Sequence, residues 1–268
     1  MPTNAFANLD PAQKVQILPR HLAGPGAVDP RTAWAFPFDE GWIFGQAKDG
    51  TAAAFSPCLR LQTNFHPQPE KPRKGTWTIG MYRTPFTPAA WTTPPTWAVT
   101  FDATTPVEIL RDVHTELLDL YLEDRPSDRD RLFEDETAAY EAYVPLLARG
   151  WSHDVKTDGT QTFLTPEGLG GIRHQYAERR SGASTWLSWG GYPSEPHWKA
   201  HFSFGTPTTL VAAFTASLVS TEPLHRTVQD VPAQTCSALY IASTTANQLH
   251  GNVSVASPPP APFSGRHR

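Results

Sequence analysis

Hydrophobic and polar residues alternate along several short segments of this chain, and the alternation predicts strands. Trp97, Val99 and Phe101 are separated by small residues, so these three should face a core while their neighbours face solvent. The segment 198–202 repeats this pattern. Further strands are expected at 15–18, 42–46, 52–55, 59–63 and 77–82.

Apolar residues at helical spacing follow each of the two alternating segments. Thr105 as N-cap, Pro106 at the first helical position and Glu108 as the partner in a capping box predict where the first helix begins. Its apolar face should cover the sheet, and it consists of Leu110, Val113, His114, Leu117, Leu118 and Tyr121.

Three more helices are expected. Thr206-Pro207 opens a helix with Leu210, Val211, Phe214 and Leu218 on its apolar face. Another helix should run from about 137 to 149 and end at Gly150, and a short one should begin at Asp29-Pro30.

The chain repeats itself. Gly41-Trp42 and the later Asp49-Gly50-Thr51 recur as Gly150-Trp151 and Asp158-Gly159-Thr160, with the same spacing. The segment 97–106 recurs at 198–207, and the change in offset is absorbed by the proline-rich segment 84–95. The repeat predicts an α+β protein of two tandem units, each with about four antiparallel strands and a covering helix. The two units should pack about an approximate twofold axis, each covering an edge or face of the other.

These patterns divide the chain into five parts. Residues 1–28 form an N-terminal segment, 29–122 the first repeat, and 137–222 the second repeat. The charged segment 123–136 reads as a solvated linker between them. Residues 223–268 form a C-terminal extension, and its proline-rich end, 252–268, should be disordered.

Composition narrows the classes of function. The chain has 268 residues and a net charge of −4, which argues against tight nonspecific binding of duplex DNA. Cys58 and Cys236 are the only cysteines, too few for a disulfide framework or a thiolate metal site. Residues 1–16 lack the apolar core of a signal peptide, and no apolar run could span a membrane. A cytoplasmic protein is therefore expected, with no membrane partner.

The repeated residues resemble the SPDY domain, a family of unknown function common in Streptomyces and related actinobacteria. The match rests on Leu22-Ala23-Gly24-Pro25-Gly26 and on residues present in both copies. In the first copy these are Gly41-Trp42, Asp49-Gly50, Pro57, Trp97 and Thr105-Pro106, and in the second Gly150-Trp151, Asp158-Gly159, Pro166, Trp198 and Thr206-Pro207. It covers about residues 15 to 225, and the second copy lacks the Leu-Ala-Gly-Pro-Gly opening. The resemblance implies no catalytic residues, and it suggests a link to chromosomal or mobile-element functions.

Basic and aromatic residues are interleaved in both units, and such a sheet face can stack and neutralise single-stranded nucleic acid. The alternative is a core sheet with a solvated outer face, in which the tryptophans simply pack. The candidate surface for nucleic acid or a partner consists of Arg73, Lys74, Trp77, Arg173, Tyr176, Arg179, Trp186, His197, Lys199 and His201.

Metal and catalytic chemistry find little support. His197 and His201 share a strand face with Lys199, but four residues along a strand place them about 13 Å apart, too far for one metal ion. Neither a phosphate-binding glycine loop nor a nucleophile elbow occurs. Asp49 and Asp158 are explained by their Asp-Gly turns. We therefore expect no metal, no cofactor and no enzyme.

The preferred hypothesis is a non-catalytic, duplicated binding module for single-stranded nucleic acid or a nucleoprotein. The alternative is a protein–protein scaffold that uses the proline-rich segment 84–95. A third hypothesis is an enzyme whose site lies between the repeats. The sequence sets no oligomeric state.

Overall fold

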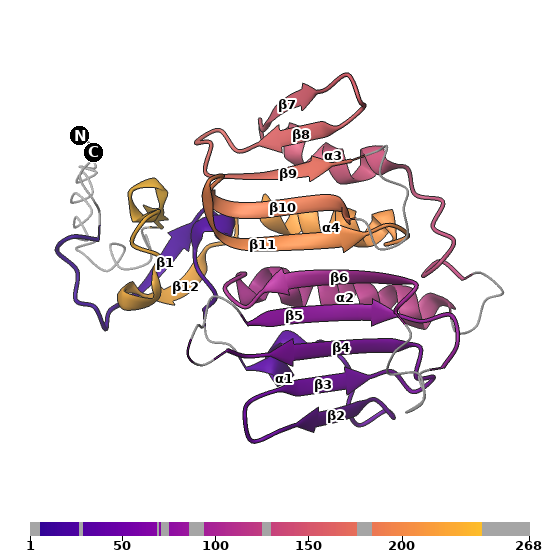
Figure 1. Ribbon diagram of the computed structural model, residues 1–268. Coiled ribbons are helices and arrows are strands. Elements are labelled where there is room, and N and C mark those ends of the chain that lie inside the picture. The colour runs from indigo at the N-terminus through magenta and orange to yellow at the C-terminus, as the bar shows by residue number, and fades with distance from the viewer. Residues whose placement is uncertain are drawn as a thin grey trace, which may run out of the picture.

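The computed structural model describes residues 6–26, 29–68, 70, 75–85, 94–124, 130–175 and 184–242. In this part of the chain, a ten-stranded antiparallel sheet is backed by four α-helices, and a three-stranded sheet lies beside it (Figure 1). The α+β class predicted from the sequence is confirmed. Among these residues, no helix is both long and apolar enough to cross a membrane.

Both halves of the chain follow the same order of elements: a helix, five strands and a second helix. The first half contains α1 (Pro30–Ala33), β2 (Ile43–Gln46), β3 (Ala52–Phe55), β4 (Leu61–His66), β5 (Thr76–Met81), β6 (Trp97–Asp102) and α2 (Val107–Asp124). The second contains α3 (Ala139–Ala148), β7 (Ser152–Val155), β8 (Gln161–Leu164), β9 (Gly170–His174), β10 (Ser184–Tyr192), β11 (Glu195–Ser203) and α4 (Thr208–Leu218). The sequence predicted about four strands in each unit, and the structure has five.

The two halves share one sheet. Its strand order is β2-β3-β4-β5-β6-β11-β10-β9-β8-β7, so the last strand of each half pairs with the last strand of the other. Thr100 lies opposite His201 in this antiparallel pair, with Val99 opposite Phe202 and Phe101 opposite Ala200. Among the strands that the structure describes, the join therefore leaves β2 and β7 as the edges of the large sheet.

The helices cover one face of the sheet, and the core lies between the two layers (Figure 1). Trp97 and Trp198 are each only 1% exposed, and Val99 and Phe101 are buried beside them. The inward positions predicted from the alternation are thus confirmed. The apolar face of α4 is also confirmed, because Leu210, Val211, Phe214 and Leu218 are all buried.

His114 is fully buried in the middle of α2, deeper than the core-edge position that its place on the apolar face suggested. One ring nitrogen, Nδ1, lies 2.7 Å from the carbonyl oxygen of Leu110, and Nε2 lies 3.3 Å from the hydroxyl of Thr63. Burial lowers the pKa of His114 to about 4, although the hydrogen bond to Leu110 acts in the opposite direction. The ring is therefore neutral near pH 7.

The small sheet joins the two ends of the described chain. Its strand order is β12-β1-β13, with β1 (Lys14–Leu18) between β12 (Leu224–Thr227) and β13 (Tyr240–Ile241). The strand expected at 15–18 is present as β1. The N-terminal segment and the C-terminal extension therefore form one structural unit.

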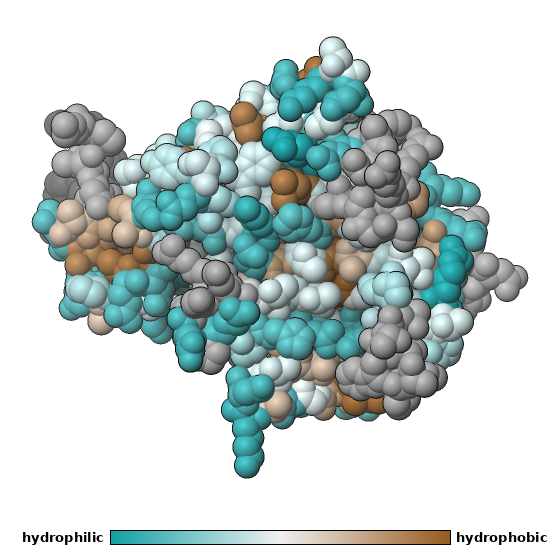
Figure 2. All heavy atoms as spheres, in the orientation of Figure 1, coloured by the Kyte–Doolittle hydropathy of each residue, from teal (hydrophilic) through white to brown (hydrophobic). Residues whose placement is uncertain are grey.

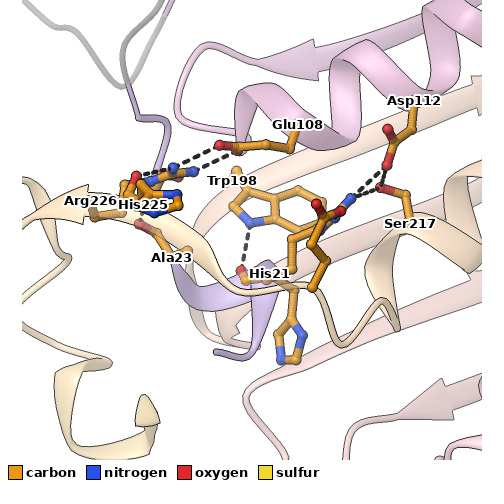
Figure 3. A network of polar contacts seen from close by, with 11 residues as sticks. His21, Ala23, Glu108, Asp112, Trp198, Ser217, His225 and Arg226 are labelled. Atoms are coloured by element: carbon orange, nitrogen blue, oxygen red, sulfur yellow. Dashed lines mark hydrogen bonds and ion pairs between the residues drawn. The ribbon is translucent and has the colours of Figure 1, made fainter. Parts of the chain in front are cut away.

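The segment that leads from this small sheet into the first half is fastened by a buried arginine (Figure 3). Arg226, whose side chain is 2% exposed, donates hydrogen bonds to the carbonyl oxygens of Ala23 and Gly24. It also pairs with both carboxylate oxygens of Glu108, at 2.8 and 2.7 Å. Gly26 has a φ of +74°, and an added Cβ there would lie 2.8 Å from the guanidinium carbon.

A second contact links this segment to the other half. The indole nitrogen of Trp198 donates to the carbonyl oxygen of His21 at 2.9 Å. Arg20 is also buried and donates to Asp112 on α2 and Ser217 on α4, at 2.6 and 2.8 Å. Residues 20–26 thus hold both halves together at one end of the helical layer.

Two sequence predictions need correction. Thr105 and Glu108 do not form a capping box: the Thr105 hydroxyl is buried with no hydrogen-bond partner among the described residues, and Glu108 pairs with Arg226. The linker is also not wholly solvated. Leu132 is buried, and its carbonyl oxygen accepts a hydrogen bond from Trp97 Nε1 at 2.6 Å. The carboxylate of Asp124 fixes this segment by accepting from the backbone N–H groups of Arg131 and Leu132.

Two other predictions concern segments outside the described residues. Most of the proline-rich segment, 86–93, is among them, and so is the C-terminal tail 252–268.

We expect Arg226→Met to lower the free energy of unfolding by about 3 to 5 kcal/mol, since it leaves Glu108 and two buried carbonyl oxygens without their donor. Urea unfolding at pH 7 measures this loss. Arg131→Met is the control, because Arg131 and Glu123 form an exposed pair that contributes less than about 1 kcal/mol. Equal losses in the two variants would contradict the buried role of Arg226.

Stability should fall as the pH drops from about 6.5 to about 4, because the unfolded state binds a proton at His114 that the folded state excludes. The loss from this one group approaches about 3 kcal/mol at pH 4. Urea unfolding at several pH values tests this, with His114→Leu expected to reduce the slope and His66→Gln, at an exposed histidine, to keep it. Part of the slope should remain in His114→Leu, because burial also lowers the pKa of His174 to about 4. A slope unchanged in His114→Leu would count against the assignment.

Candidate functional site

One face of the large sheet carries no α-helix that the structure describes. Figure 2 shows this face in the orientation of Figure 1, and hydrophilic and neutral colours prevail over the strands. The strand registers align ten outward positions, one on each strand, in a row across this face, and none of the ten is buried. The row consists of Gly45, Ala53, Asn64, Thr78, Thr100, His201, Leu187, Arg173, Thr162 and Asp154. We call the surface around this row the open face.

Charged side chains meet at the centre of the open face, where β6 and β11 pair. Asp102 Oδ2 accepts a hydrogen bond from the backbone N–H of Lys199 at 2.8 Å. Burial raises the pKa of Asp102, although this hydrogen bond and the nearby charges of His201 and Lys199 oppose the shift. Burial also lowers the pKa of His201, with Asp102 acting against the shift and Lys199 adding to it. The centre thus combines one acid with two basic residues.

Two aromatic rings of this face lie against glycines. An added Cβ on Gly171 would lie 2.5 Å from Trp189 Cζ2, so the indole of Trp189 occupies the space above that glycine. In the first half, an added Cβ on Gly80 would lie 3.4 Å from the ring of Tyr82. Trp189 is only 8% exposed, so little of its surface is free to stack against a ligand.

Trp77 and Trp186 do not belong to this surface. They are 0% and 4% exposed, and each sits at an inward position of its strand. Trp77 stacks on Phe65, and Trp186 stacks on His174 at a centroid distance of 3.9 Å. The candidate surface loses both rings because strand alternation turns them toward the helices.

The remaining predicted residues fall into two groups. Arg173, Lys199 and His201 lie on the open face, whereas His197 is only 8% exposed and its ring packs against Gly191. Four other residues lie outside the described part of the chain, namely Arg73, Lys74, Tyr176 and Arg179. Whether this surface binds a partner stays a prediction.

Sequence reasoning missed Asp102 and Tyr82. Asp102 continues the outward alternation of Ala98 and Thr100, so its direction was readable. Its contact with Lys199 was not, because it depends on the pairing of β6 with β11. In the described ranges, no three side chains of His, Cys, Asp or Glu gather as a possible metal site.

Comparisons with known proteins identify a family but assign no role to the residues of the open face. No curated protein and no solved structure matches the chain. The model of the SPDY family, described as a domain of unknown function (DUF317), matches residues 55–123 and 166–224. The first segment ends in α2 and the second ends at β12, so the match falls once in each half. The chain therefore belongs to the SPDY family and carries two copies of its domain.

Proposed function

We propose that this protein is a non-catalytic binding module and that its partner is a protein that binds on the open face. The observation that carries the proposal is the contrast between the two faces of the central strands. The inward positions Trp97 and Phe101 match Trp198 and Phe202, whereas the outward Ala98, Thr100 and Asp102 correspond to Lys199, His201 and Ser203. The inward residues are shared because both copies need the same core to fold. We attribute the differences between the outward residues to binding of a partner.

We also infer that the halves are related by an approximate twofold axis that passes between Thr100 and His201. The register supports this, because the pairs Val99 with Phe202 and Phe101 with Ala200 exchange equivalent positions. Such an axis would place one open face, made by both copies, at the centre of the molecule. A partner on that axis would contact Thr100 from one copy and His201 from the other.

The size of the open face fits a protein partner. The nine spacings of about 4.8 Å between ten strands span about 43 Å, and five residues of strand add about 16 Å in the other direction. The product, about 700 Å², is close to the area of about 800 Å² that one partner buries in a standard protein–protein interface.

The chemistry of the face also fits a polypeptide. Asp102 and Asp154 stand among Arg173, Lys199 and His201, so the described charges are mixed rather than uniformly basic. A polypeptide offers charges of both signs, whereas a nucleic acid strand offers one.

Single-stranded nucleic acid is the second candidate. Arg173 and Lys199 on the open face favour it, and so do the sequences that connect the strands, which include Arg73, Lys74 and Arg179. Among the described residues, however, no tryptophan is exposed for base stacking.

The double variant Lys199→Ala and His201→Thr gives the second copy the residues of the first, and we expect it to keep its melting temperature and lose its partner. A photocrosslinking residue at Thr78 would report the partner by mass spectrometry of complexes formed in lysate of the source cells. Lys14→Ala, at an exposed lysine on β1 of the small sheet, is the control. Recovery of the same crosslinked proteins from the double variant would contradict the proposal.

Fluorescence anisotropy separates the two candidate partners. We expect labelled single-stranded DNA and RNA to show no binding at low salt with tens of micromolar protein, because the mixed charges of the face do not favour a polyanion. Binding that weakens steeply with salt, and that is lost in Arg173→Gln and in the double variant, would instead favour nucleic acid.

A further inference from the structure

A cleft of about 450 Å³ lies between the second half of the chain and the small sheet. It is formed by the end of β1, the turn between β8 and β9, the end of α4 and the residues around β13. Its volume is in the range of pockets that hold small molecules. The cleft is separate from the open face and independent of the function proposed for that face.

The walls of the cleft are largely apolar. Leu18, Trp151, Leu218 and Val219 contribute to them, and Tyr240 stands at the rim with 73% of its surface exposed. Such a lining removes the apolar body of a ligand from water, and the exposed tyrosine ring favours a flat or aromatic one.

A buried histidine and a glutamate form one polar group in the cleft. His21 Nε2 lies 2.7 Å from Glu167 Oε1, and the His21 side chain is 5% exposed. Burial alone would raise the pKa of Glu167, but the hydrogen bond and the charge of His21 outweigh it and hold the pKa below its ordinary value. The carboxylate of Glu167 is therefore already engaged within the protein.

The other charged group of the cleft is Arg149, at the end of α3. Its guanidinium donates to the hydroxyl of Thr221 at 3.3 Å, and no carboxylate within the described residues pairs with it. A guanidinium binds a carboxylate through two parallel hydrogen bonds, and Arg149 keeps donors for that purpose. Arg149 therefore gives this cleft a positive charge that a negatively charged ligand can pair with.

The first half has a counterpart that lacks this feature. A pocket of about 430 Å³ lies beside Pro57 and Cys58, which correspond in the repeat to Pro166 and Glu167 in the cleft. There the arginine in the pocket, Arg60, already pairs with Asp130 at 3.0 Å. The arginine of that pocket therefore has an acidic partner, whereas Arg149 of the cleft has none among the described residues. The two arginines are not equivalent in the repeat, because Arg60 corresponds to Leu169.

We propose that the cleft binds a small organic acid with an aromatic or branched apolar body. The carboxylate pairs with Arg149, and the body lies against Leu18, Val219 and Tyr240. The first-half pocket does not bind this class of ligand, since its arginine is neutralised by Asp130.

The test uses 2-naphthoate as the probe and its neutral analogue 2-naphthamide for comparison, with equilibrium dialysis of the full chain. We expect one 2-naphthoate to bind per chain. Its dissociation constant should be lower than that of the amide by about tenfold or more, because only the acid forms a charge-assisted hydrogen bond with Arg149. The proposal would be overturned if 2-naphthoate did not bind at about 1 mM, a concentration at which even weak ligands are detected.

Three variants locate the site. Arg149→Gln should remove the preference for the acid over the amide, and Tyr240→Ala should weaken both by a similar factor. Arg131→Gln, an exposed arginine of the linker, should change neither. Because Arg149 and Tyr240 are both exposed, these variants should keep the melting temperature of the unaltered protein. An unaltered preference for the acid in Arg149→Gln would place the binding elsewhere and refute the assignment.

Discussion

The pairing of β6 with β11 is the interaction on which the rest of the structure depends. A strand at the edge of a sheet presents unpaired backbone groups, and each half of this chain would end in such a strand if it stood alone. The pairing satisfies both strands at once and places α2 beside α4, so one helical layer can cover ten strands. It also brings Asp102 to Lys199, which creates the charged centre of the open face.

The same end of the molecule depends on buried arginines to join segments that are distant in sequence. Arg226 joins the C-terminal extension to residues 23 and 24 and to α2, and Arg20 joins the N-terminal segment to α2 and α4. Buried charges are costly unless they are paired, so these contacts specify one arrangement more than they add stability. The pockets of the two halves also differ, because different residues surround corresponding strands.

Local sequence signals predicted much of the fold, because strand alternation and helical spacing are local properties. They gave the inward positions of Trp97 and Trp198 and the apolar face of α4. Local signals failed where a contact depends on residues distant in sequence. Glu108 was expected to cap its own helix, but it pairs with Arg226, which lies 118 residues away in the sequence. Of the candidate site, Arg173, Lys199 and His201 lie on one face as their positions allowed, whereas Trp77 and Trp186 required knowing which face the helices cover.

The join between the halves has a consequence for how such domains can multiply. Each copy uses its last strand to meet the last strand of the other, so the two copies pair both inner edges and, in the described part of the chain, β2 and β7 remain as outer edges. If the last strand of one copy paired with the first strand of the next, each added copy would leave a free edge and the sheet could grow without limit. A junction between two identical edges is instead complete with two copies. An added third copy would have to form its own pair with a fourth, so arrays of this domain should lengthen by pairs.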